Sequence, residues 1–217
     1  MIGVFGGTFD PVHHGHLRIA LELYQQLGLD ELRFVPCRQP PHRAMPQASV
    51  EQRLEMLRLA IAGQSAFVID ERELLRDGPS YMVDTLSSIR AEMPDQAICL
   101  ILGADAFGKL SSWHRWESLI ELAHIVVAMR PGSPLMFDDA MLHRLRHCQV
   151  TDSALLKRAL SGYVIQFQVP QLDISSMYIR GQLSAGLSAR YLLPDTVWDY
   201  MQQQHIYSSS IEDCCDY

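Results

Sequence analysis

The sequence predicts an α/β protein built on a doubly wound parallel sheet. Short apolar runs alternate with stretches of helical periodicity along the chain. The run at 98–102 is almost entirely apolar, as is usual for a strand that is covered on both faces. Strands separated by helices pair in parallel through right-handed crossovers, and such sheets bind ligands beyond the carboxyl ends of their strands.

Six apolar segments are expected to form the strands of this sheet. They are 1–5, 32–35, 67–69, 98–102, 125–129 and 163–169. Polar or glycine-bearing stretches follow the first, second, fourth and fifth segments, where a doubly wound sheet places its ligand site. The pattern therefore predicts one binding site, assembled from several loops at one edge of the sheet.

Helices are expected between these strands, and several carry end signals. The stretch 17–27 places apolar residues on one face and stops at Gly28, because glycine accepts the left-handed conformation of a helix C-terminus. Ser49 with Gln52 predicts a capping box, and Ser80 is expected to cap the following helix. Further helices are expected through Trp116 and Ile120, at 138–147 and 153–160, after Ser175 or Ser176, and from Pro194.

Length and composition fit a single globular unit. With 217 residues, of which 48% are hydrophobic and 20% are charged, the chain can bury a full core. We expect one domain over 1–207, with a variable helical insertion at 133–161 and a small helical C-terminal part at 175–207. The small, polar and acidic segment 208–217 is expected to be a disordered tail, in which Cys214 and Cys215 have no assigned role.

Charge and cysteine content argue against several classes of protein. A net charge of −7 opposes non-specific attraction to nucleic acid, so any phosphate binding must be local. The five cysteines are odd in number and have no C-x-x-C spacing, which indicates neither a disulfide framework nor a zinc site. The sequence has no signal-peptide pattern and no apolar run of membrane-spanning length, so a reducing cytoplasm is the expected location.

The most informative segment is 6–16, which reads GGTFDPVHHGH between the first predicted strand and the first predicted helix. Gly6 and Gly7 permit a tight turn and a close approach of the backbone to a ligand. The following helix N-terminus supplies N–H groups and partial positive charge for an anion. If the helix has begun here, His13 and His16 lie on one face and are directed at the same anion. Imidazoles beside phosphate groups indicate phosphoryl chemistry.

Two motifs in this order resemble those of the nucleotidyltransferase superfamily. Residues 13–16 resemble its H-x-G-H motif, and residues 174–180, ISSMYIR, resemble the I-S-S-T-x-I-R segment that completes the same site. With these motifs, residues 1–207 are similar to the bacterial nicotinate-nucleotide adenylyltransferases, and the resemblance implies a Rossmann-like nucleotidyltransferase fold. The other segments that carry the resemblance are QPPHR (39–43), PSYMVDTL (79–86), GADAFGKLSSWHRW (103–116) and RPG (130–132).

The resemblance implies transfer of the adenylyl group of ATP. The 5′-phosphate of nicotinate mononucleotide would attack the α-phosphorus of ATP and release pyrophosphate, without an enzyme nucleophile. Such transfers are catalysed mainly by alignment and by neutralising charge on the leaving group. The implied catalytic roles are contact of His16 with the α-phosphate, support of the α- and β-phosphates by His13, and binding of the departing pyrophosphate by Arg180.

The resemblance also implies the rest of the ATP site. Backbone N–H groups are expected to complete an anion cradle, and Mg²⁺ is expected to be carried by ATP, with no fixed metal site on the protein. Asp105 is expected to accept a hydrogen bond from a ribose hydroxyl, with a helix N-cap as the alternative. The implied ATP- and phosphate-binding residues are Gly6, Gly7, Thr8, Phe9, Gly103, Asp105, Ile174, Ser175 and Ser176.

The second substrate, nicotinate mononucleotide, is assigned to the loops after the other strands. Trp113 is expected to stack on the cationic pyridinium ring, with simple core packing as the alternative. Backbone N–H groups around Met82 and His114 are expected to bind the nicotinate carboxylate. The loop at 39–43 either closes over phosphates or is a solvated turn. The implied acceptor-binding residues are His42, Arg43, Met82, Thr85, Trp113 and His114.

Three positions depart from the pattern of the family. Threonine is usual where this sequence has Met82 and Met177, and tyrosine is common at His114. Backbone donors would survive the loss of a threonine side chain at Met82. If the side chain at Met177 matters, Ser175, Ser176 or backbone amides must compensate for the hydrogen bond that methionine cannot donate.

Other functions remain open at this point. A sister nucleotidyltransferase would keep both motifs and use nicotinamide mononucleotide, phosphopantetheine or a phosphoalcohol as acceptor. A non-catalytic nucleotide sensor would keep the fold, and a metal-storage protein could hold Zn²⁺ on His13, His14 and His16, although no convincing fourth ligand lies nearby. His14 stands at the variable position of its motif and is expected to face solvent. The oligomeric state stays open between a monomer and a homodimer.

Overall fold

A six-stranded parallel sheet forms the centre of the computed structural model, which describes residues 1–41, 44–129, 137–170 and 172–208. The strand order is β3-β2-β1-β4-β5-β6, and every neighbouring pair runs parallel. The fold class expected from the sequence, a doubly wound α/β sheet, is therefore confirmed. The strands are β1 (Ile2–Gly7), β2 (Glu31–Pro36), β3 (Phe67–Ile69), β4 (Ile98–Gly103), β5 (His124–Met129) and β6 (Val164–Gln168).

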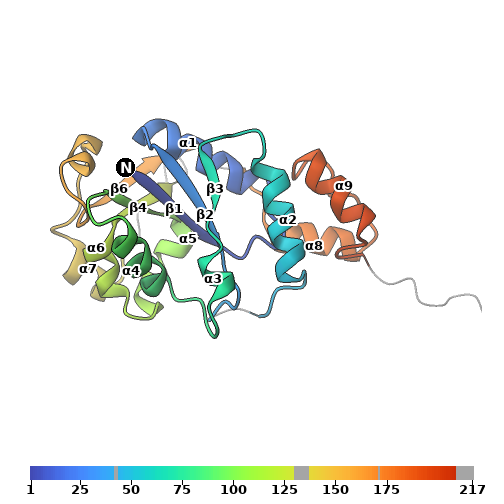
Figure 1. Ribbon diagram of the computed structural model, residues 1–217, viewed down its shortest axis with the longest axis horizontal. Coiled ribbons are helices and arrows are strands. Elements are labelled where there is room, and N and C mark those ends of the chain that lie inside the picture. Colours follow the sequence, from blue (N-terminus) through green and yellow to red (C-terminus); the bar gives the residue numbers. More distant parts are fainter. Residues whose placement is uncertain (42–43, 130–136, 171, 209–217) are drawn as a thin grey trace, which may run out of the picture.

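Helices cover both faces of this sheet (Figure 1). The first cluster of buried side chains packs beneath α1, α2, α8 and α9, and the second beneath α4, α5, α6 and α7. Val4 and Phe5 are successive residues of β1 that lie in different clusters, because side chains alternate across a strand. The helices are α1 (His14–Leu27), α2 (Val50–Ile61), α3 (Arg72–Leu75), α4 (Met82–Glu92), α5 (Ala104–Phe107), α6 (Leu119–Leu122), α7 (Asp139–Leu145), α8 (Ser176–Ser184) and α9 (Asp195–Gln203).

Several helix ends agree with the sequence analysis. Gly28 follows α1 in the left-handed conformation, with φ 59°, and its N–H caps carbonyls of the last turn. Ser49 and Gln52 form the predicted capping box at the start of α2. Ser175 is the N-cap of α8, and Pro194 precedes the first residue of α9.

Other expectations need correction. The first strand does not stop at residue 5: β1 continues through Gly6 and Gly7, which pair with Val35 and Pro36 of β2. Likewise α1 begins at His14 and not at residue 17, since the motif itself supplies the first turn. Ser80 does not cap α4, whose N-cap is Tyr81, because the Ser80 hydroxyl accepts a hydrogen bond from the Arg38 N–H at 3.0 Å.

The segments around residues 110–160 are less regular than expected. The helix predicted through Trp116 is divided into two 3₁₀ turns, Leu110–Ser112 and Trp116–Ser118, followed by the short helix α6. The expected insertion begins outside the described residues; from 137 it contains α7 and a 3₁₀ helix at Ser153–Lys157. Across the described ranges, no helix combines the length and the apolar character needed to cross a membrane.

The topology places the motif segments together. From β1 the chain continues to β2 and β3, which lie on one side of β1 in the sheet. It then returns to β4, which pairs with the other side of β1, so the strand order reverses between β1 and β4. The H-x-G-H segment follows the carboxyl end of β1, and residues 103–116 follow that of β4. At one end of the molecule, α8 and α9 lie beside α2 (Figure 1). Ligands of doubly wound sheets bind at this kind of switch point.

Candidate active site

Two stacked imidazole rings lie at the start of α1. The ring centroids of His13 and His16 are 3.8 Å apart with an interplanar angle of 28°. His13 is the N-cap of the helix in extended backbone conformation, and His16 belongs to its first turn. Phe9 packs its edge against the His16 ring, with centroids 5.2 Å apart. The rings therefore share one face, as the spacing predicts, and a buried aromatic side chain supports them from below.

His13 is buried, and one of its ring nitrogens has no hydrogen-bond partner among the described residues. The residue is only 4% exposed, and its Nδ1 atom has no hydrogen-bond partner among the described residues. Burial, assisted by the charge of His14, lowers the pKa of His13 to about 4, so its ring is neutral at neutral pH. A buried polar atom without a partner is costly, which indicates that a ligand completes this position.

Gly15 allows α1 and the segment before α8 to meet. A Cβ atom at this position would lie 2.9 Å from Nδ1 of His13 and 3.4 Å from the carbonyl oxygen of Ile174. Any larger residue would thus push the His13 ring or the backbone at Ile174 away. Gly15 therefore permits the close packing that joins the two sequence motifs, which lie about 160 residues apart in the chain.

The N-terminus of α8 is anchored next to the segment that follows β1. Ser175 caps the helix, since its hydroxyl accepts a hydrogen bond from the Tyr178 N–H at 3.1 Å. The Ser176 hydroxyl donates to the carbonyl oxygen of Pro11 at 2.9 Å. Both hydroxyls are thus used within the protein, and the unpaired backbone N–H groups of the first turn are what this helix offers to an anion. The Met177 side chain is 75% exposed, so it is not packed into the protein at the start of this helix.

Arg180 lies one helical turn further along α8 and faces the same segment. Its Nη1 atom donates to the carbonyl oxygen of Asp10 at 2.5 Å and lies 3.5 Å from Asp10 Oδ2. Its Nε atom is buried without a hydrogen-bond partner in the part of the chain that the structure describes. The three residues with implied catalytic roles, His13, His16 and Arg180, are thus gathered around residues 10–16.

Arg53 is a residue of this site that the sequence analysis missed. It lies on the buried face of α2 and is 1% exposed, and its Nη1 atom donates to the carbonyl oxygens of Thr8 and Cys37, at 2.8 Å each. It ties the end of β1 to the end of β2, while Thr8 Oγ1 lies 3.6 Å from Cys37 Sγ. The sequence did carry a signal for its burial. Arg53, Met56 and Leu57 have the i, i+3, i+4 spacing of residues on one apolar helix face.

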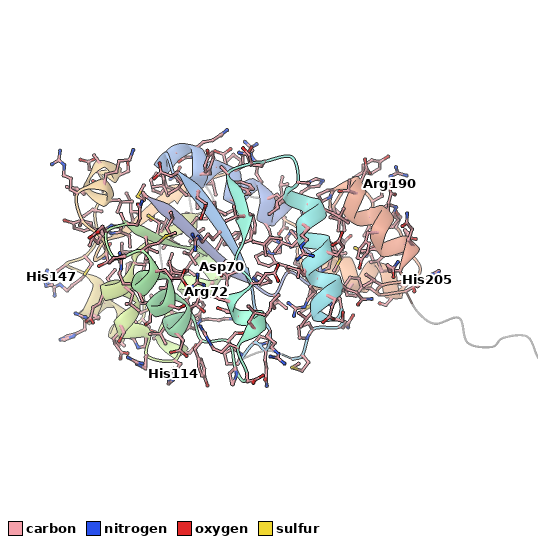
Figure 2. The ribbon with its side chains drawn as sticks, in the orientation of Figure 1. Asp70, Arg72, His114, His147, Arg190 and His205 are labelled. Carbon is pink, nitrogen blue, oxygen red and sulfur yellow. The ribbon has the colours of Figure 1, made fainter. Side chains whose placement is uncertain are left out.

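The opposite side of the site is formed by the start of α4 and the loop after α5. The Met82 side chain reaches β1, because a Cβ atom on Gly6 would lie 2.5 Å from Met82 Cε. Tyr81, another residue that the sequence analysis missed, packs its ring on His114 with centroids 4.4 Å apart. His114 is exposed at the rim of the molecule (Figure 2), and Trp113 is half-buried against the second core cluster.

Thr85 lies in the interior, on α4. Its side chain is fully buried, and its hydroxyl donates to Glu73 Oε1 at 2.6 Å. Burial raises the pKa of the Glu73 carboxyl, although hydrogen bonds from Thr85 and Ser80 oppose this shift. The Thr85 hydroxyl is thus committed to an interior carboxyl group, and the contact of this residue with nicotinate mononucleotide stays a prediction.

The end of β4 is open. A Cβ atom on Gly103 would meet no described atom within 4 Å, so space for a ligand exists there. Asp105 is exposed in the first turn of α5, and Gly103 is the N-cap, so the alternative reading of Asp105 as a cap is wrong. His42, Arg43 and the segment 130–132 lie outside the described residues. Among the residues that are described, no three histidine, cysteine or acidic side chains are grouped to hold a metal ion.

The fold and the two joined motifs define a nucleotidyltransferase of the cytidylyltransferase-like class, whose family model matches residues 4–182. A protein of Methylococcus capsulatus described as a "probable nicotinate-nucleotide adenylyltransferase" is 51% identical over 209 residues, which cover 96% of this chain and 100% of that protein. One of Aeromonas salmonicida with the same description is 45% identical, covering 96% and 97% of the two chains. The chain belongs to the family of nicotinate-nucleotide adenylyltransferases.

A solved structure agrees at the level of the fold. The Plasmodium falciparum nicotinic acid mononucleotide adenylyltransferase complexed with NaAD superposes with a TM-score of 0.72 at 18% identity. The match covers 97% of this chain and 98% of that one. The doubly wound arrangement is therefore shared across a large distance in sequence.

Proposed function

We propose that this chain transfers the adenylyl group of ATP to nicotinate mononucleotide, forming nicotinate adenine dinucleotide and pyrophosphate in the biosynthesis of NAD. The observation that carries the proposal is the assembly of stacked His13 and His16, Arg180 and the α8 N-terminus around the segment after β1. This set offers hydrogen-bond donors and positive charge, and Arg180 faces the buried Asp10. It suits a triphosphate.

In the proposed step, an oxygen of the nicotinate mononucleotide phosphate forms a bond to the α-phosphorus of ATP. The bond from that phosphorus to the bridging oxygen breaks, and pyrophosphate leaves with the electron pair. His16 stabilises the charge on the α-phosphate, His13 supports the α- and β-phosphates, and Arg180 receives the departing pyrophosphate. Mg²⁺ enters with ATP and shields the phosphate charge.

The other proposed contacts follow the placement of the loops. Backbone N–H groups at the end of β1 and at the start of α8 hold the phosphates, and Asp105 at the open end of β4 accepts a hydrogen bond from ribose. On the acceptor side, Trp113 stacks on the pyridinium ring, while N–H groups near Met82 and His114 bind the carboxylate. His42 and Arg43 remain part of the proposal for the acceptor phosphate. The expected compartment is the cytoplasm.

Pyrophosphate release by the purified protein tests this function. The assay uses Mg·ATP with nicotinate mononucleotide, nicotinamide mononucleotide or phosphopantetheine as the acceptor. Release with nicotinate mononucleotide at the highest kcat/KM supports the proposal. A preference for another acceptor keeps adenylyl transfer but overturns the substrate, and release with none of them overturns the activity.

A further inference from the structure

The chain turns back toward the site after α9. His205 and Tyr207 both have positive φ values, 51° and 63°, and Ile206 between them is buried, with its N–H donating to the Met201 carbonyl oxygen at 3.0 Å. His205 marks this turn in Figure 2. Bulky residues rarely adopt left-handed backbone conformations unless other interactions hold them there. Here the turn carries the Tyr207 side chain to the segment that follows β1.

The group that Tyr207 reaches is the buried carboxylate of Asp10. The Tyr207 hydroxyl donates to Asp10 Oδ1 at 2.6 Å, and the N–H groups of Ala48 and Gln47 donate to Oδ1 and Oδ2 at 3.1 and 3.0 Å. Asp10 is only 3% exposed, so these three bonds determine where its carboxylate lies. Burial and the hydrogen bond to Asp10 raise the pKa of Tyr207, so its hydroxyl stays protonated and remains a donor.

The same residue sets the orientation of Arg180. Asp10 accepts a hydrogen bond from Arg180 Nη1 through its carbonyl oxygen, and its carboxylate lies 3.5 Å from that nitrogen. One edge of the guanidinium is therefore occupied by Asp10, and the remaining donors are left for a ligand. Because a guanidinium binds through a planar, directional set of donors, its orientation matters as much as its charge.

We propose that Tyr207 and Asp10 are positioning residues, in which the Tyr207 hydroxyl holds the Asp10 carboxylate and Asp10 holds Arg180 in the orientation that receives pyrophosphate. This inference rests on the proposed function, since it deepens the role of Arg180. It makes the end of the described chain, 197 residues away from Asp10, a part of the nucleotide site. Docking of α9 against α2 would then be needed to complete that site.

The first test compares Tyr207→Phe with Tyr200→Phe. Tyr200 is a half-buried residue of α9 whose hydroxyl has no hydrogen bond to a described residue, which makes it a matched control. Loss of the Tyr207 hydroxyl is expected to lower kcat for pyrophosphate release about tenfold, because small displacements of an aligned group are costly. The KM for nicotinate mononucleotide should stay within about twofold, and Tyr200→Phe should match the wild type. Circular dichroism checks that both variants are folded.

A double-mutant cycle with Arg180→Lys separates positioning from a merely structural role. If Tyr207 acts through Arg180, the Tyr207→Phe change slows the wild-type enzyme but has little further effect in the Arg180→Lys background. Asp10→Asn should behave like Tyr207→Phe in this cycle. Wild-type kcat in Tyr207→Phe, or an equal loss in both backgrounds, overturns the proposal.

Failure of the proposed function would be recognised separately. If the wild-type chain releases no pyrophosphate with any acceptor, the activity itself is wrong, and the same cycle is measured on ATP affinity by isothermal titration calorimetry. Weaker ATP binding by Tyr207→Phe only when Arg180 is present supports the positioning role. Equal affinity of the wild type and Tyr207→Phe overturns it.

Discussion

At the scale of single residues, the rings of His13 and His16 can stack because at least one of them, His13, carries no charge at neutral pH. Two protonated imidazoles would repel each other at a centroid distance of 3.8 Å. Burial first, and the neighbouring His14 second, lower the pKa of His13 to about 4, so it stays neutral at neutral pH. The two rings can therefore stack without repulsion between two charged groups.

His16→Ala is expected to lower kcat by about 10²–10³-fold, because it removes a donor that acts on charge in the transition state. The dissociation constant of ATP should change much less, since the other phosphate contacts remain. Steady-state kinetics and calorimetry with ATP measure the two quantities. His14→Ala is the control and should keep nearly wild-type kinetics; an equal loss in both variants would contradict the assignment.

Gly15→Ala is expected to impair the site through sterics. The added methyl group would press on His13 Nδ1 and on the Ile174 carbonyl oxygen, so kcat should fall at least about tenfold. The matched control is Gly181→Ala in α8, where a Cβ atom meets no described atom within 4 Å. That change should raise the free energy of unfolding by about 0.5–1 kcal/mol and leave kcat unchanged. Full activity of Gly15→Ala would show that the two motifs need not pack so closely.

At the scale of secondary-structure elements, α2 supports the backbone of the candidate site. Its capping box starts the helix directly after Gln47 and Ala48, whose N–H groups bind Asp10. One turn later, Arg53 holds the carbonyl oxygens at the ends of β1 and β2. The element thus orients the backbone at the ends of β1 and β2, through the N–H groups that precede it and through one buried side chain.

Ser49→Ala removes the capping-box hydrogen bond from the Gln52 N–H to the Ser49 hydroxyl, whereas the backbone N–H of residue 49 keeps its bond to Gln52 Oε1. We expect the free energy of unfolding to fall by about 1 kcal/mol, which is typical for the loss of an N-cap. Because Arg53 keeps the helix in place, kcat of the folded enzyme should stay within about twofold of the wild type. Urea unfolding measures the first quantity, with the exposed Ser65→Ala as control. No loss of stability would mean that the cap is replaced by solvent at little cost.

At the scale of the whole molecule, two buried neutral histidines link stability to pH. His13 lies at the site, and His124 lies in the sheet, where its Nδ1 atom accepts from the Tyr163 N–H at 3.2 Å and its Nε2 atom lies 3.0 Å from the Ala159 carbonyl oxygen. The accepting Nδ1 requires a neutral ring. Burial lowers the pKa of both residues below the value of 6.5 for an exposed histidine.

Acid should therefore destabilise the fold. Below about pH 6.5 the unfolded chain takes up protons on these histidines, whereas folded His13 does so only near pH 4. The stability that is present above about pH 6.5 is lost as the pH falls, with a slope approaching about 1.4 kcal/mol per pH unit for His13 and a further contribution of the same sign from His124. Urea unfolding between about pH 7.5 and about pH 5.5 measures this slope. His13→Asn and His124→Asn should flatten it, and the exposed His143→Asn should not; equal slopes in all four proteins would refute this origin.

Particular residues show where sequence reasoning succeeded and where it did not. The helix cap at Gly28 and the capping box of Ser49 were predictable, since each depends on neighbouring residues. Ser80 was misassigned as a cap, and the partner of the Thr85 hydroxyl could not be predicted, because a hydroxyl near a helix start can serve as a cap, a ligand contact or a partner for a distant group. Their partners, Arg38 and Glu73, are brought to them by the fold.

The sequence alone determined the fold class and the two motifs of the candidate site. Periodicity, glycine placement and motif spacing are local properties of the chain, and burial of the apolar runs leaves few arrangements open. Only the tertiary structure decided that Arg53 joins the ends of two strands and that Tyr207 reaches Asp10 across 197 residues. Such contacts depend on where distant elements pack: the spacing of Arg53 indicates a place on the buried face of its helix, but it does not indicate which carbonyl oxygens the side chain meets.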